Sequence, residues 1–316
     1  MSPHNLEGRL TTYLTLRKGL GMQLGAESTV LADFVKFVGD QETTGAVTTK
    51  MVFDWLDATR ERQHRPIASR RLSVVRQFLL YLSAAVPDTQ VPEVRLVASY
   101  RRPKPFIFTP DEIERLLRSA AELRPGDFRS VVLHTILGLI AATGLRASEA
   151  LDLDRSDVMP RSAPETLLIR DAKFHKTRIV PLHASTAQQL RVYAGHRELL
   201  GFGLQTTAFF VSSHGRRLSY AALNESFRLI LGKAVIKPHD GSNKPTLHSL
   251  RHTFVVSRLR RWHEEGLDVE ARLAHLATYV GHVDFRETYW YMTATPELLG
   301  AAATDFHAPT CAGGDE

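Results

Sequence analysis

The sequence has little cysteine and no long hydrophobic segment. Its single cysteine among 316 residues, Cys311, cannot form an intrachain disulfide. The longest apolar run, residues 131–145, contains His134 and two threonines and is shorter than the roughly 18 to 20 residues of a membrane span. Residues 1–9 lack the apolar stretch of a secretory signal peptide. These absences exclude a disulfide scaffold and a membrane-spanning protein, and we expect a cytoplasmic location.

Positive charge is concentrated in the N-terminal third. The whole chain has 40 Lys and Arg against 34 Asp and Glu, and residues 1–104 alone hold 15 against 10. The remainder is almost balanced. A basic region of this kind favours a polyanionic partner such as nucleic acid, because neutralised phosphates release counterions. From charge alone, a basic surface that only keeps the protein in solution explains the excess equally well.

The N-terminal part is predicted to form a helical domain over residues 1–85. Apolar residues at spacings of three and four, such as Leu31, Phe34, Val35 and Val38, predict helices over 6–18, 28–40, 48–63 and 69–83. Residues 86–105 break this pattern with four prolines and carry the basic run Arg101, Arg102 and Lys104. We interpret them as an extended linker, which either lies along a polyanion or is simply solvated.

A second domain is predicted over residues 106–316. Thr109, Pro110 and Glu112 have the types and spacing of a helix start with a capping box. Further helices are expected over 127–142, 146–151, 185–200, 221–231, 247–262 and 269–280. The β-rich segments 166–170 and 178–182 predict a hairpin with a basic tip, and one more short strand is expected near 209–211. The expected fold class is mainly α with a small antiparallel β-sheet in this domain.

Four separated segments of the second domain carry side chains suited to phosphate chemistry. They contain Arg146 after a Thr-Gly turn, Lys173 and Lys176 on the hairpin, His248 with Arg251, and His282 followed nine residues later by Tyr291. His248 and Arg251 are three residues apart and share a helix face. Two guanidiniums can fix the nonbridging oxygens of a phosphorane-like transition state through forked hydrogen bonds. Each segment alone is more often structural, and it is the ordered set that indicates function.

These segments resemble the motifs of the tyrosine recombinases, the phage-integrase family. The stretches that carry the resemblance are ATGLRASEAL (142–151), KTRIVPL (176–182), LHSLRHTF (247–254) and VGH (280–282) with Tyr291. Their order and spacing match over about 150 residues, and the helical N-terminal region is similar to that family's core-site-binding domain. Residues 289–299 also resemble recombinases of transposon-type mobile elements, which makes DNA integration and transposition the expected setting.

The resemblance implies a role for each matching residue. Arg146 and Arg251 would stabilise the transition state, and Tyr291 would attack the scissile phosphate to give a 3′-phosphotyrosyl intermediate. His248 would assist proton transfer at the tyrosine, and His282 would position the phosphate. Lys173 would protonate the 5′-hydroxyl leaving group. Neither a metal nor another cofactor is implied.

Several positions leave alternatives open. The hairpin lacks the glycines that usually flank the family's lysine, so Lys176 competes with Lys173 as general acid. Tyr289 competes with Tyr291, although the nine-residue offset from His282 favours Tyr291. Glu149 is expected to orient a basic group or to cap its helix. His248 and His252 have the spacing of a helical zinc pair, but Ser249 replaces the glutamate of that motif, so we expect His252 and His275 to be packing or surface residues.

The predicted function is site-specific DNA recombination. The partner would be double-stranded DNA with inverted-repeat core sites, bound by a homotetramer, with or without sister recombinases, in the nucleoid. Candidate DNA contacts are Arg70, Arg71, Arg76, Arg101, Arg102, Lys104 and Lys176. Residues 296–306 would form a C-terminal helix that is exchanged between neighbouring subunits or that packs within its own subunit. The alternatives are a recombinase-like DNA-binding accessory protein that does not cleave, and a type IB topoisomerase.

Overall fold

The computed structural model describes residues 6–22, 24–41, 46–58, 65–93, 104–159, 165–172, 176–201, 206–239, 242–282 and 291. The chain forms two compact units, Met1–Arg102 and Pro103–Glu316. Each has a hydrophobic core of its own. Within the described ranges, no helix combines the length and the apolar character that crossing a bilayer requires.

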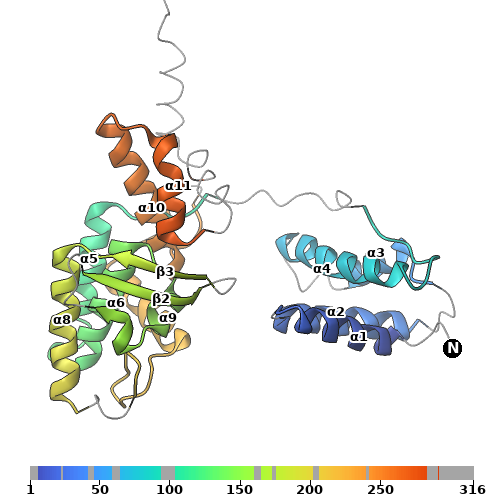
Figure 1. The fold of residues 1–316 in the computed structure, drawn as a ribbon, viewed down its shortest axis with the longest axis horizontal. Helices are drawn as coiled ribbons and strands as arrows, with labels where there is room; N and C mark the ends of the chain where they lie inside the picture. The colour runs from blue at the N-terminus through green and yellow to red at the C-terminus, as the bar shows by residue number, and fades with distance from the viewer. Residues whose placement is uncertain are drawn as a thin grey trace, which may run out of the picture. The chain divides into compact units, whose positions relative to one another are not determined.

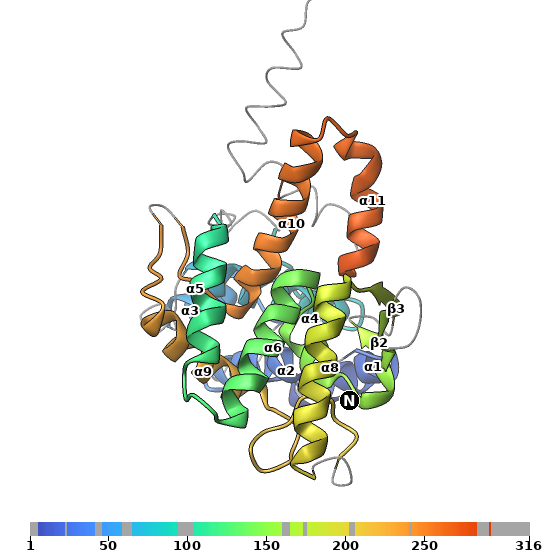
Figure 2. The ribbon, with the colours of Figure 1, turned by 90° about the vertical axis from the view of Figure 1, so that its left-hand side faces the viewer.

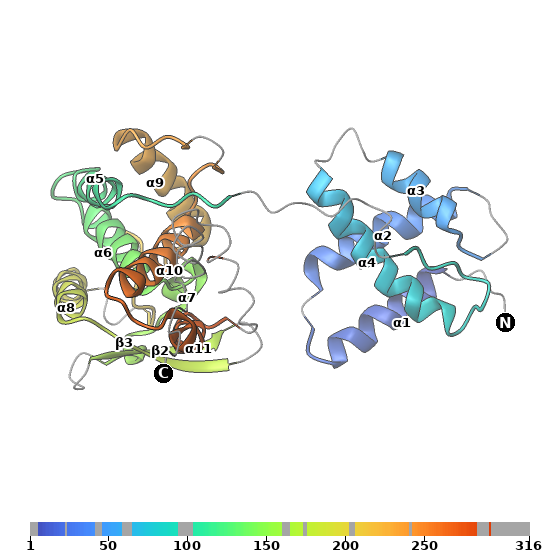
Figure 3. The same ribbon diagram turned by 90° about the horizontal axis from the view of Figure 1, so that it is seen from above.

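The first unit packs four helices around one core (Figure 3). They are α1 (Leu6–Gly19), α2 (Gly25–Gly39), α3 (Thr49–Ala58) and α4 (Arg65–Ser83). The core contains large side chains that are almost completely buried, among them Phe34, Trp55 and Phe78. The rings of Phe34 and Trp55 meet edge to face with centroids 5.2 Å apart, a favourable aromatic geometry. The helical character predicted for this part of the chain is confirmed.

The chain that follows α4 continues to contact this unit. Val86 and Val91 pack against the helical core, and Thr89 is buried. The Gln90 N–H donates to the carbonyl oxygen of Val47 at 2.9 Å, and Arg76 Nε donates to the Pro92 carbonyl at 2.9 Å. The first part of the segment expected to be a linker therefore packs onto the helices.

The second unit is mainly helical (Figure 1). Its helices are α5 (Pro110–Ala121), α6 (Phe128–Thr143), α7 (Ala147–Asp152), α8 (Ala184–Leu199), α9 (Tyr220–Lys233), α10 (Leu247–Glu264) and α11 (Val269–Val280), with a 3₁₀ turn at Arg155–Asp157. The predicted capping box of α5 is confirmed, because Glu112 N–H donates to Thr109 Oγ1 and Thr109 N–H donates to Glu112 Oε2. Helix α6 is apolar around most of its circumference and forms the centre of the core.

A three-stranded antiparallel sheet lies beside these helices (Figure 1). Its strands are β1 (Val158–Met159), β2 (Thr166–Ala172) and β3 (Lys176–Pro181), in the order β1-β2-β3. Leu167 pairs with Val180 and both are buried, whereas Ile179 points to the solvent. The predicted hairpin and fold class are confirmed. Strand β1 was not predicted, and the strand expected near 209–211 is wrong, because Val211 makes only an isolated bridge with Arg217.

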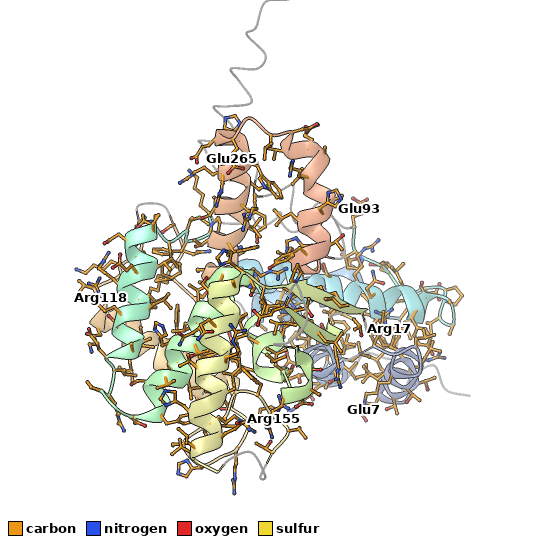
Figure 4. The ribbon with its side chains drawn as sticks, turned by 60° about the vertical axis from the view of Figure 1, so that its left-hand side comes forward. Glu7, Arg17, Glu93, Arg118, Arg155 and Glu265 are labelled. Atoms are coloured by element: carbon orange, nitrogen blue, oxygen red, sulfur yellow. The ribbon has the colours of Figure 1, made fainter. Side chains whose placement is uncertain are left out.

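Helices α10 and α11 stand side by side as an antiparallel pair (Figure 2), and Glu265 lies at the turn between them (Figure 4). Their shared core includes Phe254, Val280 and Tyr291. Helix α6 ends at Gly144, whose φ of 65° requires the left-handed conformation. A Cβ at Gly144 would lie only 2.5 Å from Phe254 Cδ1. Glycine therefore lets α10 pass close to the segment that carries Arg146.

Candidate active site

Arg146 links two helices at the centre of the candidate site. It is the N-cap residue of α7, and its N–H donates to Glu149 Oε2 at 2.9 Å. Its guanidinium donates from Nη1 to Glu149 Oε1 at 2.8 Å and from Nη2 to the carbonyl oxygen of Gly281 at 3.0 Å. The Gly281 carbonyl belongs to the end of α11. These hydrogen bonds fix the position of the Arg146 side chain.

Glu149 is a buried carboxylate that holds two arginines. In addition to Arg146, it accepts hydrogen bonds from Arg178 Nη1 at 3.0 Å and Nη2 at 2.9 Å. Burial alone would raise the pKa of Glu149, but the hydrogen bonds and charges of Arg178 and Arg146 outweigh it and hold that pKa below its usual value. Both roles that the sequence suggested for this residue, capping and orientation of a basic group, are confirmed.

Arg178 is a part of the site that the sequence analysis did not identify. It comes from β3, its side chain is 11% exposed, and its Nε donates to the Tyr279 carbonyl at 3.0 Å. It therefore ties the sheet to α11. A Cβ on Gly281 would lie 2.6 Å from Arg178 Nη1, so the close approach requires glycine. The available signal was its position two residues after Lys176, in the predicted strand of the hairpin.

Arg251 is a deeply buried cation with unused hydrogen-bond donors. It lies on α10, is 1% exposed, and donates from Nη1 to the Gly144 carbonyl at 2.7 Å. Its Nε and Nη2 are buried without a partner among the described residues. Burial and the charge of Arg146 lower the pKa of Arg251 to about 10, so the guanidinium remains charged at neutral pH. Two donors of a fixed cation are left for an additional acceptor.

Tyr291 lies against the same helix. Its side chain is 3% exposed, and its hydroxyl is 2.6 Å from Nδ1 of His252. His252 packs against the Tyr291 ring, as expected of a packing residue, and in addition hydrogen-bonds the phenol of the candidate nucleophile. The sequence placed His252 next to Arg251 but held no information on which helical residue faces Tyr291.

Two further imidazoles complete the cluster. The His248 ring meets the His252 ring edge-on, with centroids 4.4 Å apart, and the His282 ring is parallel to Tyr291 at 6.3 Å. Burial, and then the charges of Arg251 and Arg146, lower the pKa of His282 to about 3. His282 is therefore neutral at physiological pH and can exchange hydrogen bonds without adding charge.

Some predicted site residues cannot be placed. Lys173, Arg101, Arg102, Tyr289 and the expected helix over 296–306 lie outside the described residues, and for Lys176 only the backbone, at the start of β3, is described. The structure therefore brings together the two arginines, His248, His282 and Tyr291 from α7, α10, the end of α11 and the segment beyond it.

The predicted DNA contacts of the first unit differ in their surroundings. Arg71 is 11% exposed, forms an ion pair with Asp33 and lies over the Trp55 ring at 4.2 Å. It packs within its unit rather than extending from it. Arg70 is 71% exposed and keeps the accessibility that a phosphate contact requires. In the second unit, Lys104 is exposed and its backbone pairs with Ser242.

The rival zinc site finds no additional ligand in the part of the chain that the structure describes. No group of three or more His, Cys, Asp or Glu residues is placed there to hold a metal ion. What the described residues form instead is a tyrosine hydroxyl beside an imidazole, two fixed arginines and a neutral histidine. A buried phenol beside an imidazole and cationic hydrogen-bond donors is an arrangement that suits phosphoryl transfer.

Known proteins resemble this chain over most of its length. Residues 107–297 match the phage integrase family. The putative integrase/recombinase y4rB of Sinorhizobium fredii (strain NBRC 101917 / NGR234) is 34% identical over 301 residues, which cover 92% of this chain and 93% of the relative. The tyrosine recombinase XerD of Oceanobacillus iheyensis is 25% identical over 304 residues, which cover 93% and 95% of the two chains.

The fold has solved counterparts. The crystal structure of the XerH site-specific recombinase in a post-cleavage complex with palindromic difH substrate superposes with a TM-score of 0.70 at 18% identity, covering 89% of this chain and 78% of that one. The chain belongs to the phage integrase family. The family, the fold class and the expected enzyme class, a tyrosine-type site-specific recombinase, are confirmed.

Proposed function

We propose that this site-specific recombinase cleaves and rejoins DNA through Tyr291. The observation that carries the proposal is the convergence of Tyr291, Arg251 and Arg146 from distant segments on one site, where the tyrosine hydroxyl already has a hydrogen-bond partner at 2.6 Å. Both arginines are oriented by backbone carbonyls, those of Gly281 and Gly144. Such preorganised donors stabilise charge that develops in a transition state.

The reaction conserves the energy of the phosphodiester bond. The phenol oxygen of Tyr291 forms a bond to phosphorus, the bond to the 5′-oxygen breaks, and a 3′-phosphotyrosyl link remains. Lys173, or Lys176 in its place, would give a proton to the leaving 5′-oxygen, and His248 and His282 would support the phosphate and its proton transfers. Attack by another 5′-hydroxyl reverses the step, so strand exchange requires no high-energy cofactor.

The scissile phosphate would occupy the unused donors of Arg251. The Nε and Nη2 atoms have no partner among the described residues, and they match two oxygens of a phosphate in the forked geometry typical of arginine. Because the side chain is 1% exposed, a phosphate would reach these donors only after local opening of the site. DNA binding and assembly of the site are therefore coupled.

The complete machine would be a homotetramer on two inverted-repeat core sites, acting alone or with sister recombinases on DNA in the nucleoid. The helical N-terminal domain, proposed to comprise residues 1–85, would bind the core site, and the linker with Arg101, Arg102 and Lys104 would cross the backbone. Residues 296–306 would be exchanged between subunits. The palindromic substrate of XerH supports the inverted-repeat arrangement, and the exposed Arg70 supports a DNA contact by the first unit.

The experiment that tests this proposal traps the covalent intermediate. Sheared, nicked genomic DNA of the source organism is incubated separately with wild type, Tyr291→Phe and Tyr289→Phe. The protein is then denatured, and the DNA that remains attached to it is sequenced. Nicked fragments accumulate the intermediate because the short 5′ strand diffuses away. We expect adducts with wild type and Tyr289→Phe but not with Tyr291→Phe, and we expect the trapped fragments to share an inverted repeat.

Other outcomes support other functions. Adducts that persist in Tyr291→Phe and vanish in Tyr289→Phe would assign the nucleophile to Tyr289. DNA binding without adducts in all three proteins would favour a noncleaving accessory protein. Adducts at unrelated sequences, together with relaxation of any supercoiled plasmid, would favour a type IB topoisomerase.

A further inference from the structure

The hydrogen bond at the Tyr291 hydroxyl belongs to a residue outside the set implied by the sequence motifs. His252 Nδ1 lies 2.6 Å from the phenol oxygen, and the two rings have centroids 5.3 Å apart. We propose that His252 is the catalytic proton acceptor for Tyr291, an inference that rests on the proposed function. His248, which the resemblance assigned to this task, lies one helical turn before His252 and contacts its ring.

The placement on α10 gives His252 a geometric advantage. Arg251 and His252 are consecutive residues of this helix, so the ligand of the phosphate and the acceptor of the phenol proton are fixed to one rigid element. Tyr291 is 3% exposed, which leaves little room for bulk water to take its proton. A general base must lie within about 2.6 to 3.2 Å of the proton donor, and the 2.6 Å distance satisfies this requirement.

The phenol proton moves to His252 during cleavage and returns to the tyrosine during religation. Neutral His252, protonated at Nε2, accepts the phenol proton at Nδ1 as the Tyr291 oxygen bonds to phosphorus. The bond between phosphorus and the 5′-oxygen breaks, and the 5′-oxygen takes a proton from the lysine general acid. During religation the 5′-hydroxyl gives its proton to the lysine as its oxygen bonds to phosphorus, the bond between phosphorus and the tyrosine oxygen breaks, and the imidazolium returns its proton to that oxygen. No oxidant, metal or external base enters either step.

The charged and titratable groups around the tyrosine are consistent with this role. Arg251 from α10 lies close enough to Tyr291 for their charges to interact, and the His282 ring at the end of α11 is parallel to the tyrosine ring. Arg146, Arg178 and His248 act electrostatically on His282. Burial and these charges lower the pKa of His282, and the neutral form of an imidazole is the one that accepts a proton. The field of the positive charges also stabilises a phenolate, and an arriving phosphate offsets it when the imidazolium forms.

The hydrogen bond itself can be tested without DNA. Full-length protein with ¹⁵N-labelled histidine is examined by long-range ¹H–¹⁵N NMR, and His252 is assigned with His252→Ala. We expect an unprotonated Nδ1 and a protonated Nε2 in wild type, and an Nδ1 signal that moves in Tyr291→Phe. A protonated Nδ1 in wild type, or an Nδ1 signal that does not move in Tyr291→Phe, would overturn the proposal.

The chemical role is tested on the nicked site recovered by trapping. In single-turnover assays His252→Ala should form the adduct about 10² to 10⁴ times more slowly than wild type, and added imidazole should restore part of the rate, more strongly as pH rises through the pKa of free imidazole. His252→Asn places an amide near the Nδ1 position without a comparable basic group. It should therefore keep the fold and DNA affinity but remain slow. His248→Ala is the matched control and should gain nothing from imidazole.

Three results would contradict the assignment. A His252→Ala protein that cleaves as fast as wild type, or faster, would make the hydrogen bond a mere contact or a restraint on the tyrosine. Imidazole rescue of His248→Ala instead of His252→Ala would assign the proton to His248. Absence of adducts in wild type would refute the proposed function and the acceptor role together, and the NMR measurement would still show separately whether the hydrogen bond exists.

Discussion

The most informative perturbation of the site is Glu149→Gln, because one carboxylate holds both Arg146 and Arg178. Glu149 accepts four hydrogen bonds from these two residues, and its side chain is 6% exposed. Glutamine has nearly the same shape, but its amide carries no charge and replaces one acceptor oxygen by a donor. The substitution therefore leaves the guanidiniums of Arg146 and Arg178 close together without a negative charge between them. One of the two oxygens that accepted their hydrogen bonds becomes an NH₂ group, which points donors at donors.

The expected cost follows from this burial. Removing one partner of a buried ion pair typically destabilises a protein by about 3 to 5 kcal/mol. Since the Arg146 side chain retains 22% exposure and can regain some water, we expect about 3 kcal/mol for Glu149→Gln. The hydrogen bonds and charges of the two arginines keep the pKa of Glu149 below its usual value. The contribution of Glu149 to the free energy of unfolding is thus complete above the pKa that this carboxyl has in the unfolded chain. It is lost as the pH falls through the lower pKa that the carboxyl has in the folded protein.

The assay is urea unfolding of the full-length protein at neutral pH. Unfolding is monitored by pulsed hydrogen exchange and mass spectrometry of peptides, which reports on each of the two units separately. The matched control is Glu198→Gln, which breaks an ion pair with Arg155 whose side chains are 45% and 63% exposed. We expect about 0.5 kcal/mol or less for that exposed pair. If Glu149→Gln also costs less than about 0.5 kcal/mol, the argument that Glu149 organises the arginines is refuted.

Further predictions concern other contacts. Gly281→Ala should displace Arg178, because the new Cβ would lie 2.6 Å from its Nη1 at a φ of 70°, and adduct formation should fall at least about tenfold in the trapping assay, equivalent to about 1.4 kcal/mol. Arg71→Ala should cost about 1 to 2 kcal/mol in urea unfolding of the first unit through lost indole and carboxylate contacts. Arg70→Ala should leave that stability unchanged within about 0.5 kcal/mol. The lowered pKa of His282, about 3 against an ordinary 6.5, implies that its contribution to stability is full above pH 6.5 and declines as pH falls toward 3. His282→Gln should therefore flatten the loss of stability that wild type shows over this range in urea titrations at several pH values; an unchanged slope would contradict the burial argument.

Local signals predicted much of the fold. The capping box at Thr109 and the apolar periodicity of the N-terminal helices depend on residues that are neighbours in the sequence, and the structure contains both. Strand β1 escaped prediction because its two residues become a strand only by pairing with β2. The segment after α4 was assigned to the linker from its prolines, but Val91 is apolar and packs on a core that the local pattern does not reveal.

In the candidate site, too, residue types could be predicted from the sequence, whereas contacts between distant segments could not. The motif resemblance identified the Arg146 and Arg251 that the structure brings together, because their types and order are visible in the chain. The partners that fix them are the Gly281 and Gly144 carbonyls, and every residue has a carbonyl, so no residue type marks this role. Arg178 and His252 were missed for a related reason. Their importance depends on which way a strand or helix faces in three dimensions.

The most direct test of the central claim is to identify the amino acid that carries the DNA. Adducts trapped with wild type are digested with trypsin and nuclease, and the peptide that retains a nucleotide is sequenced by tandem mass spectrometry. We predict that the nucleotide is attached to Tyr291 through a 3′-phosphate. Attachment to Tyr289, to a serine or to a 5′-phosphate would contradict the proposed function, since the arginines, His252 and His282 converge on Tyr291.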